Sequence, residues 1–459
     1  MPTSRRVTAV PTAVLMVAAL GLAAAAPMIA ATAPAIGPIG IGPIGIGATA
    51  PAADAPAPAL PRAAPAELGF SPERLDRLDR AMQGYVDRGE LAGVVVLVAR
   101  KGKVAHLESY GARDAEAKAP MTDDTIFRIA SMTKPIASVA LMMLWEEGRF
   151  QLRDPVAKYL SELADPVIAV PPDPLEYHGE PTRTIAARNP ITIQHLLTHT
   201  AGLANNYRGP TRDAYQAMRR RLPPEATVAD MVAELAKIPL DFEPGTAWEY
   251  GPATDVVGLL VEVISGQRLD RFLEERIFEP LGMTDTHFYL PPAKLPRFAA
   301  LYRPNGEGEI ELAEAPTDES RYLRQPQTYF SGAGGLVSTA ADYFRFHQMM
   351  LNGGELDGVR ILGRKTVELM TANHTGDLGI WLRGPGYGFG LGYSVVVDQG
   401  ASAMPSSVGS YSWGGAFCTT FWVDPEEELI GILMTQIRPY THLNVRQDFA
   451  TLTYQALVD

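Results

Sequence analysis

The chain has 459 residues, of which 46% are hydrophobic and 20% charged, a composition that supports a sizeable core and excludes disorder throughout. The formal net charge of −12 argues against a nucleic-acid partner, because phosphate binding needs clustered Lys and Arg. The one basic run, at 219–221, is expected on a solvated helix face. The length suggests about two to three domains, although one enzymatic domain with insertions can run as long.

An export signal is predicted over residues 1–26. Arg5 and Arg6 precede an uncharged apolar run from Val7 to Ala26, and small residues that suit a cleavage site follow. The alternative is an uncleaved membrane anchor, because about twenty apolar residues are long enough to span a bilayer. We therefore expect a periplasmic or secreted protein that contacts a membrane only if this segment is retained. The sequence does not decide the export route.

Residues 27–66 are predicted to be a linker. They are rich in Ala, Pro and Gly and repeat the sequence IGPIG at 36–40 and 41–45, so they have little to pack. The catalytic domain is expected to span 67–459, with a helical insertion at roughly 150–330.

A helix and a hairpin are predicted at the start of this domain. Ser71 and Pro72 suit an N-cap and first turn, and apolar residues at helical spacing continue to Arg88. Two apolar runs joined around Lys101 and Gly102 indicate a β-hairpin.

Strand-like segments return near the C-terminus, whereas the middle of the chain is mostly helical. The expected strands are 387–397, 411–423 and 429–436, and the expected helices are 131–147, 191–198, 226–237, 254–264 and 339–351. This order predicts an α+β fold, an α/β sandwich whose sheet comes from both chain ends and is flanked by helices, with an inserted all-helical region. The active site is expected at their junction.

The candidate nucleophile is Ser131, in the sequence Ser-Met-Thr-Lys at the start of a predicted helix. Positions i and i+3 share a helix face, so the amine of Lys134 can reach the Ser131 hydroxyl. A serine hydroxyl needs a base, and a lysine serves as one only where burial or positive charge lowers the pKa of its amine. The motif alone also fits a capping serine followed by an exposed lysine.

Two further segments carry candidate site residues. Tyr250 precedes a predicted helix and could relay a proton between the serine and a leaving group, or simply pack in the core. Gly414 and Gly415, after Trp413, are expected to open a strand and let the backbone approach a ligand, where an N–H could face an oxyanion. A β-bulge is the alternative for the two glycines.

Other chemistries find less support in the sequence. Cys418 is the only cysteine, so no intrachain disulfide or thiolate cluster can form, and we expect it to be buried and structural. His195 and His199 have i, i+4 spacing but lack the glutamate of a zinc protease, so we expect no metal. The chain has no G-x-S-x-G, which argues against an α/β-hydrolase.

Taken in this order, the three segments resemble the serine β-lactamase and penicillin-binding-protein superfamily, in its class C-like branch with the family VIII carboxylesterases. The phrases LLTHTAGL at 196–203, GGLVSTAADYFRF at 334–346 and YGFGLGY at 387–393 extend the resemblance over about residues 68–457. The resemblance implies a β-lactamase-like fold and an acyl-enzyme on Ser131, with Lys134 and Tyr250 sharing the acid and base roles. It also implies an oxyanion hole made by the N–H groups of Ser131 and Ala416.

Two departures from the family pattern concern the substrate. The third motif usually supplies Lys or His and a hydroxyl for a substrate carboxylate, but here it is Trp413-Gly414-Gly415. The second motif usually has Asn two residues after the tyrosine, where this chain has Pro252. Both changes point to carboxylic esters, with Trp413, Gly414, Gly415 and Tyr387 as expected substrate contacts.

Several alternatives stay open at this stage. A β-lactamase, a D-amino-acid peptidase or amidase, and an acyltransferase would all use the same site, and a non-catalytic penicillin-sensing or acyl-binding module would retain the serine. We expect a small-molecule acyl substrate and no cofactor. The sequence indicates neither the acyl and alcohol groups nor the oligomeric state.

Overall fold

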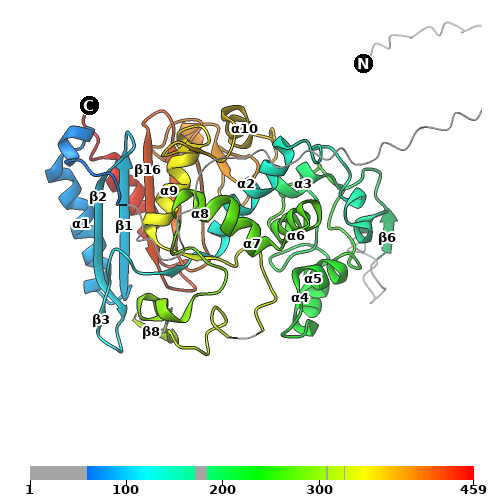
Figure 1. Cartoon of the computed structure of the whole chain (residues 1–459), viewed down its shortest axis with the longest axis horizontal. Coiled ribbons are helices and arrows are strands. Elements are labelled where there is room, and N and C mark those ends of the chain that lie inside the picture. The colour runs from blue at the N-terminus through cyan, green and yellow to red at the C-terminus, as the bar shows by residue number, and fades with distance from the viewer. Residues whose placement is uncertain (1–58, 171–182, 307–308, 325) are drawn as a thin grey trace, which may run out of the picture. The chain divides into compact units, whose positions relative to one another are not determined.

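The main sheet combines strands from both ends of the chain. In the computed structural model its N-terminal strands are β1 (Gly93–Arg100), β2 (Lys103–Asp114) and β3 (Ala119–Pro120). Its C-terminal strands are β12 (Tyr387–Phe389), β13 (Ser394–Val396), β14 (Tyr411–Gly414), β15 (Thr420–Asp424) and β16 (Leu429–Thr435). They lie in the order β12-β13-β14-β15-β16-β1-β2-β3, and every neighbouring pair is antiparallel. The predicted α+β fold is confirmed (Figure 1).

The structure describes residues 59–170, 183–306, 309–324 and 326–459, all within one unit that spans Thr49–Asp459. The predicted export signal and most of the predicted linker lie outside these residues. At the end of the linker segment, Val104 of β2 exchanges backbone hydrogen bonds with Pro61 and Ala63. The domain boundaries stay predictions. No helix in the described part of the chain is long and apolar enough to cross a membrane.

Strand β1 is buried on both faces. Val94, Val96 and Val98 pack in one hydrophobic cluster, whereas Val95 and Leu97 belong to the other. Alternate side chains of a strand point to opposite faces, so an unbroken apolar run indicates a strand covered on both sides. This explains why the sequence at 93–99 shows no polar alternation.

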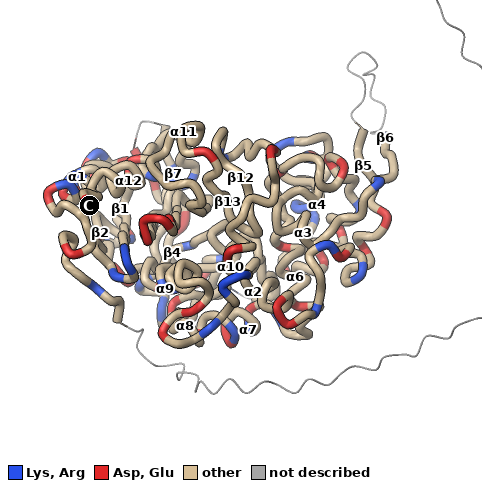
Figure 2. The backbone as a smooth tube through the Cα atoms, turned by 90° about the horizontal axis from the view of Figure 1, so that it is seen from above, with Lys and Arg blue, Asp and Glu red and all other residues tan. Residues whose placement is uncertain are grey.

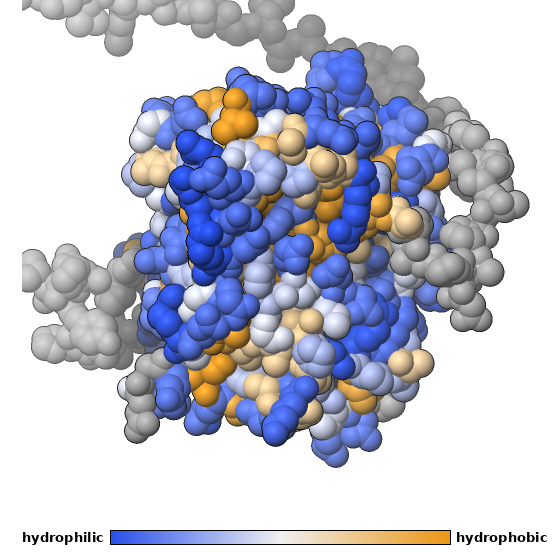
Figure 3. Space-filling view, turned by 90° about the vertical axis from the view of Figure 1, so that its left-hand side faces the viewer, coloured by the Kyte–Doolittle hydropathy of each residue, from blue (hydrophilic) through white to orange (hydrophobic). Residues whose placement is uncertain are grey.

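Helices from distant parts of the chain cover one face of the sheet. α1 (Pro72–Asp87) begins after Ser71, whose hydroxyl accepts a hydrogen bond from the Arg74 N–H, as the predicted N-cap requires. It lies beside α12 (Val445–Tyr454) from the other chain end (Figure 2). Seen from the α1 side, hydrophilic side chains surround small separate hydrophobic areas (Figure 3).

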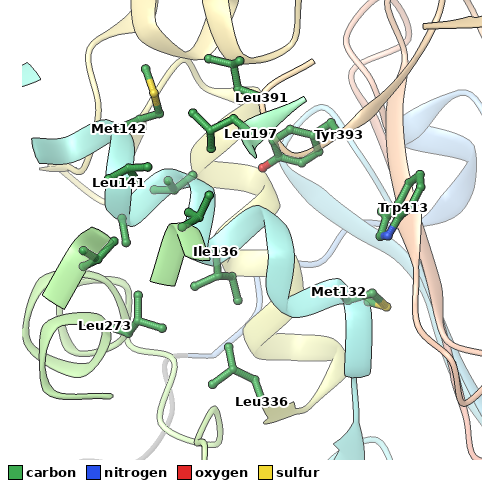
Figure 4. Packing of buried hydrophobic residues seen from close by; sticks show 14 of the residues in the cluster. Met132, Ile136, Leu141, Met142, Leu197, Leu273, Leu336, Leu391, Tyr393 and Trp413 are labelled. Atoms are coloured by element: carbon green, nitrogen blue, oxygen red, sulfur yellow. The ribbon is translucent and has the colours of Figure 1, made fainter. Parts of the chain in front are cut away.

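α2 (Thr133–Glu146) and α9 (Ala340–Leu351) contribute to the core on the opposite face. α2 is buried along most of its length, and Figure 4 shows its side chains packed on several sides, with Met132 just before the helix and Trp413 on the neighbouring strand. A helix that is apolar all round must be enclosed by other elements. The predicted helix at 131–147 is therefore present, although a 3₁₀ turn (Ala130–Met132) places Ser131 just before it.

Residues 150–330, which lie between the two halves of the sheet in the chain, contain more helix than strand. The helices of this region are α3 (Ile193–Leu197), α4 (Arg212–Arg221), α5 (Val228–Leu235), α6 (Ala253–Ser265), α7 (Leu269–Leu273) and α8 (Glu279–Leu281). It also contains two short hairpins, β5 (Val167–Val170) with β6 (Arg183–Ala186) and β7 (Leu301–Pro304) with β8 (Ile310–Glu314).

The remaining short elements connect these layers. They are the pair β4 (Phe127–Arg128) and β9 (Val337–Ser338), the pair β10 (Glu355–Leu356) and β11 (Val359–Arg360), α10 (Arg364–Met370) and α11 (Gln399–Ser402). Cys418 is a free, buried cysteine, as predicted, but it lies in the turn between β14 and β15 with φ of 70°.

His347 of α9 is a buried histidine whose charge state depends on folding. It is 0% exposed, its ring stacks at 4.0 Å on Phe421, and neither ring nitrogen has a hydrogen-bond partner in the structure. Burial lowers the pKa of His347 well below the ordinary value of 6.5. The folded protein therefore keeps this imidazole neutral at pH values where the unfolded chain protonates it.

Replacing His347 with Leu should reduce the loss of stability on acidification. Below the ordinary pKa the unfolded wild type binds a proton that the folded state excludes, so stability falls with pH by up to about 1.4 kcal/mol per pH unit from this group. Urea unfolding of wild type and His347→Leu between about pH 7 and pH 5 measures the difference. His442→Leu, at an exposed histidine, is the control, and equal pH dependence in wild type and His347→Leu would contradict the assignment.

Candidate active site

Ser131 lies in a strained turn that neighbouring segments hold in place. Ala130, the residue before it, has φ of 44°, which is uncommon for a residue with a Cβ. The Tyr343 hydroxyl donates to the Met132 carbonyl at 2.8 Å, and the Leu336 N–H donates to the Thr133 hydroxyl at 3.1 Å. The turn is therefore clamped by α9 and by the strand segment that precedes it.

Lys134 points its amine at Ser131 from the first turn of α2. The side chain is buried, with 3% of the residue exposed. Its Nζ donates to the Ala333 carbonyl at 2.8 Å and lies 3.4 Å from the Ser131 Oγ. The predicted proximity is observed, and the alternative of an exposed lysine is excluded by the burial.

Tyr250 completes a group of three around the serine hydroxyl. Its hydroxyl donates to the Ser131 Oγ at 2.7 Å, and its ring centroid lies 4.7 Å from the Lys134 Nζ. The indole N–H of Trp413 donates to the Tyr250 hydroxyl at 3.4 Å. Lys134 and Tyr250 therefore meet at the Ser131 Oγ, and Trp413 of β14 joins them through the Tyr250 hydroxyl.

His199 supports Tyr250 from behind. The His199 carbonyl accepts a hydrogen bond from the Glu249 N–H at 2.9 Å, and the ring centroids of His199 and Tyr250 lie 5.1 Å apart. Burial and the charge of Lys134 hold the pKa of His199 well below its ordinary value. His195, its i, i+4 neighbour, bonds instead to Thr192 at the start of α3, so the two histidines have separate local roles.

The third motif approaches the nucleophile turn through a glycine. Gly414 is the last residue of β14 and Gly415 follows it. The two glycines therefore lie at the end of a strand, whereas the sequence predicted that they begin one. A Cβ on Gly415 would lie 2.4 Å from the Ile129 carbonyl oxygen and 2.2 Å from the Thr419 hydroxyl. Ala416 comes next, in the turn after β14, and its part in an oxyanion hole stays a prediction.

The wall of the site is aromatic. The ring centroid of Trp413 lies 5.3 Å from those of Tyr250 and Phe389, and that of Trp248 lies 5.5 Å from Phe389. Sequence reasoning singled out Trp413 but missed Trp248 and Phe389. Trp248 lies two residues before Tyr250, and Phe389 lies within the sequence YGFGLGY at 387–393. Their aromatic character beside these motifs was the signal that could have identified them as site residues.

Tyr387 is placed apart from this group. Its ring lies 4.7 Å from the Arg383 guanidinium, and Tyr387 lines a cavity, together with Trp422 and Arg446, to which Ser131 does not contribute. Among the described residues no hydrogen bond or ring contact joins Tyr387 to Ser131. From β12, Phe389 is the residue that reaches the site.

Comparison with known proteins gives a consistent family. The family model described as Beta-lactamase matches residues 78–454. Protein Rv1367c of Mycobacterium tuberculosis is 37% identical over 388 residues, covering 80% of this chain and 90% of that protein. Esterase EstB of Burkholderia gladioli is 31% identical over 375 residues, covering 78% of this chain and 89% of the esterase.

A solved structure shows the same fold. EstCE1, described as a hydrolase with promiscuous acyltransferase activity, superposes with a TM-score of 0.69 at 27% identity, covering 84% of this chain and 98% of EstCE1. The similarity extends over the sheet and the helical region together.

Adding one methyl group at Gly415 should lower the reactivity of Ser131. Gly415→Ala places a Cβ against backbone and forces the end of β14 away from Ile129, which should slow labelling of Ser131 by a fluorophosphonate about tenfold or more. Gly379→Ala, where a Cβ would meet no atom within 4 Å, is the control. Equal labelling rates in both variants would show that the approach of β14 does not matter.

Proposed function

Since this chain belongs to the beta-lactamase family of serine hydrolases, we propose that it hydrolyses carboxylic esters through an acyl-enzyme on Ser131. One observation carries the proposal: the Ser131 Oγ lies 2.7 Å from the Tyr250 hydroxyl and 3.4 Å from the Lys134 Nζ. A hydroxyl held by two proton-transferring groups is the arrangement that an activated serine nucleophile needs.

In the proposed first step the Ser131 Oγ attacks the ester carbonyl carbon and its proton passes to the pair formed by Lys134 and Tyr250. The negative charge on the carbonyl oxygen is stabilised by the N–H groups of Ser131 and Ala416. As the tetrahedral intermediate collapses, the C–O bond to the alcohol breaks and the alkoxide takes the proton back through Tyr250. Water then gives a proton to the same pair as it attacks the acyl-enzyme carbonyl carbon, the bond from that carbon to the Ser131 Oγ breaks to release the carboxylic acid, and the pair returns the proton to the Ser131 Oγ.

Esters are favoured over β-lactams by the character of the third motif. Trp413 is 5% exposed and its indole N–H bonds to Tyr250, so this position supplies an aromatic surface and no positive charge or aliphatic hydroxyl. Two relatives support the choice through their names, Esterase EstB at 31% identity and the lovastatin esterase of Penicillium rubens at 28%.

Acyl transfer is a second candidate that the same acyl-enzyme would allow. EstCE1 is described as having promiscuous acyltransferase activity, and a relative in Penicillium decumbens at 28% identity is named Acyltransferase calJ. An alcohol that replaces water in the second step would give a new ester. Product analysis with and without added alcohol separates transfer from hydrolysis.

We also propose that the enzyme acts after export, in the periplasm or outside the cell. The support is the charged start and apolar run at 1–26. N-terminal sequencing of the processed protein tests this, and an intact N-terminus in a soluble cell fraction would contradict it.

Removing the nucleophile or its base should abolish turnover of a short-chain aryl ester. Ser131→Ala should leave no measurable hydrolysis, and Lys134→Ala should lower kcat by about 10²–10⁴-fold, the usual scale of general acid–base catalysis. Lys158→Ala, at an exposed lysine on the surface, should retain wild-type rates. A loss below about tenfold in Lys134→Ala would remove the lysine from the mechanism.

Substrate class is tested by running the aryl ester beside a chromogenic cephalosporin. Wild type should turn over the ester with little cephalosporin cleavage, because the site lacks a charged anchor at Trp413. Efficient cephalosporin hydrolysis would establish a β-lactamase instead. Acylation without turnover on either compound would favour the sensor or acyl-binding alternative.

A further inference from the structure

A large cavity lies next to the segment that holds Lys134. Its volume is about 660 Å³, within the usual range of small-molecule sites. One side is formed by the end of α4 and the other by residues between β8 and β9, which run along the same lower side of the molecule in Figure 1. No role in the proposed mechanism accounts for this space.

The cavity lies beside the turn that leads to Ser131. Gly334 lines it, and a Cβ on Gly334 would lie 3.5 Å from the carbonyl carbon of Ala130. Asp255, also in the lining, accepts hydrogen bonds from the Ser331 hydroxyl at 2.6 Å and the Ala333 N–H at 3.1 Å. Ala333 is the residue whose carbonyl holds Lys134, so one loop serves both the catalytic group and the cavity.

Four arginines line the cavity: Arg219, Arg220, Arg321 and Arg324. None of them forms an ion pair with a carboxylate of the described residues, whereas Arg271 on α7 pairs with both Glu274 and Glu275. The one carboxylate in the lining is Asp255, which already accepts two hydrogen bonds. A chain with net charge −12 therefore gathers unbalanced positive charge at this place.

Two of these arginines, Arg219 and Arg321, are each held by a tyrosine that leaves most of the guanidinium donors unused. Arg219 donates to the Tyr329 hydroxyl at 2.7 Å, and Arg321 donates to the Tyr322 hydroxyl at 2.7 Å while lying 4.8 Å from that ring centroid. A guanidinium has five N–H donors, arranged to bind a planar anion. Burial raises the pKa of Tyr215 to about 12, so its phenol in the lining is a neutral donor.

We propose that this cavity binds a carboxylate on the substrate, at a distance from the ester bond that Ser131 attacks. The inference rests on the proposed ester hydrolysis, because it concerns the substrate of that same site. A carboxylate matches the arginine donors in geometry and charge, and the tyrosine rings suit the carbon chain that connects it to the ester. The site would select acidic esters over neutral ones of the same length.

The test compares acidic and neutral esters in two arms. In the acyl arm, nitrophenyl half-esters from succinate to suberate are compared with nitrophenyl alkanoates of matching length. In the alcohol arm, acetyl esters of hydroxy acids are compared with acetyl esters of matching alcohols. Wild type should favour the acidic ester by about tenfold or more in kcat/KM in one arm, which identifies the half of the substrate that carries the charge.

The double variant Arg219→Gln, Arg321→Gln should lower the ratio of acidic to neutral kcat/KM about tenfold or more. Arg212→Gln, on the same helix but paired with Asp213 and outside the lining, is the matched control and should keep the ratio. Independently of any variant, added salt should reduce the wild-type preference, because it screens the charges. A wild type without preference in either arm, or an unchanged ratio in the double variant, would overturn the proposal.

A failure of the proposed function is distinguishable from a failure of this inference. Hydrolysis of neutral esters without any acidic preference rejects the carboxylate site alone. If no ester is hydrolysed, calorimetry with adipate decides: binding to wild type that is lost in the double variant supports the site, and no binding to wild type overturns it.

Discussion

The active centre depends on one close approach, in which the backbone at the end of β14 packs directly against the turn before α2. A Cβ on Gly415 would fall 2.4 Å from the Ile129 carbonyl oxygen, so only glycine allows the two segments to meet at this distance. One segment comes from the C-terminal half of the sheet and the other from the start of the buried helix. This contact brings the end of β14, which carries Trp413, against the turn that leads to Ser131.

A second constraint acts on the buried lysine. Taking an amine out of water is unfavourable unless it finds partners, and Lys134 finds them in the Ala333 carbonyl and the Ser131 hydroxyl. Ala333 is in turn fixed through its N–H by Asp255 of α6. Besides supplying Tyr250, the helical region thus positions the loop around Ala333 that holds the Lys134 amine. The same loop forms part of the wall of the arginine-lined cavity.

Local patterns in the sequence were sufficient for much of the fold. The N-cap at Ser71, the apolar run at 93–99 and the glycine turn after Arg100 are short-range signals, and the structure contains the helix and hairpin they predict. The residue at which a helix or strand begins was harder to predict from the sequence. Ser131 stands in a 3₁₀ turn before α2, because contacts from Tyr343 and Leu336, both more than 200 residues away, decide the backbone there.

By itself the sequence determined which residue types make up the candidate centre, since spacing on one helix places Lys134 one turn from Ser131 and ordered motifs add Tyr250 and Trp413. Only the tertiary structure decided which other side chains join them. It placed Tyr387 beside Arg383 and brought Phe389 and Trp248 to the site. It also gathered Arg219 and Arg321 around one cavity, although each reads as an ordinary surface charge in the sequence. These are contacts between segments far apart in the chain, and no local periodicity encodes them.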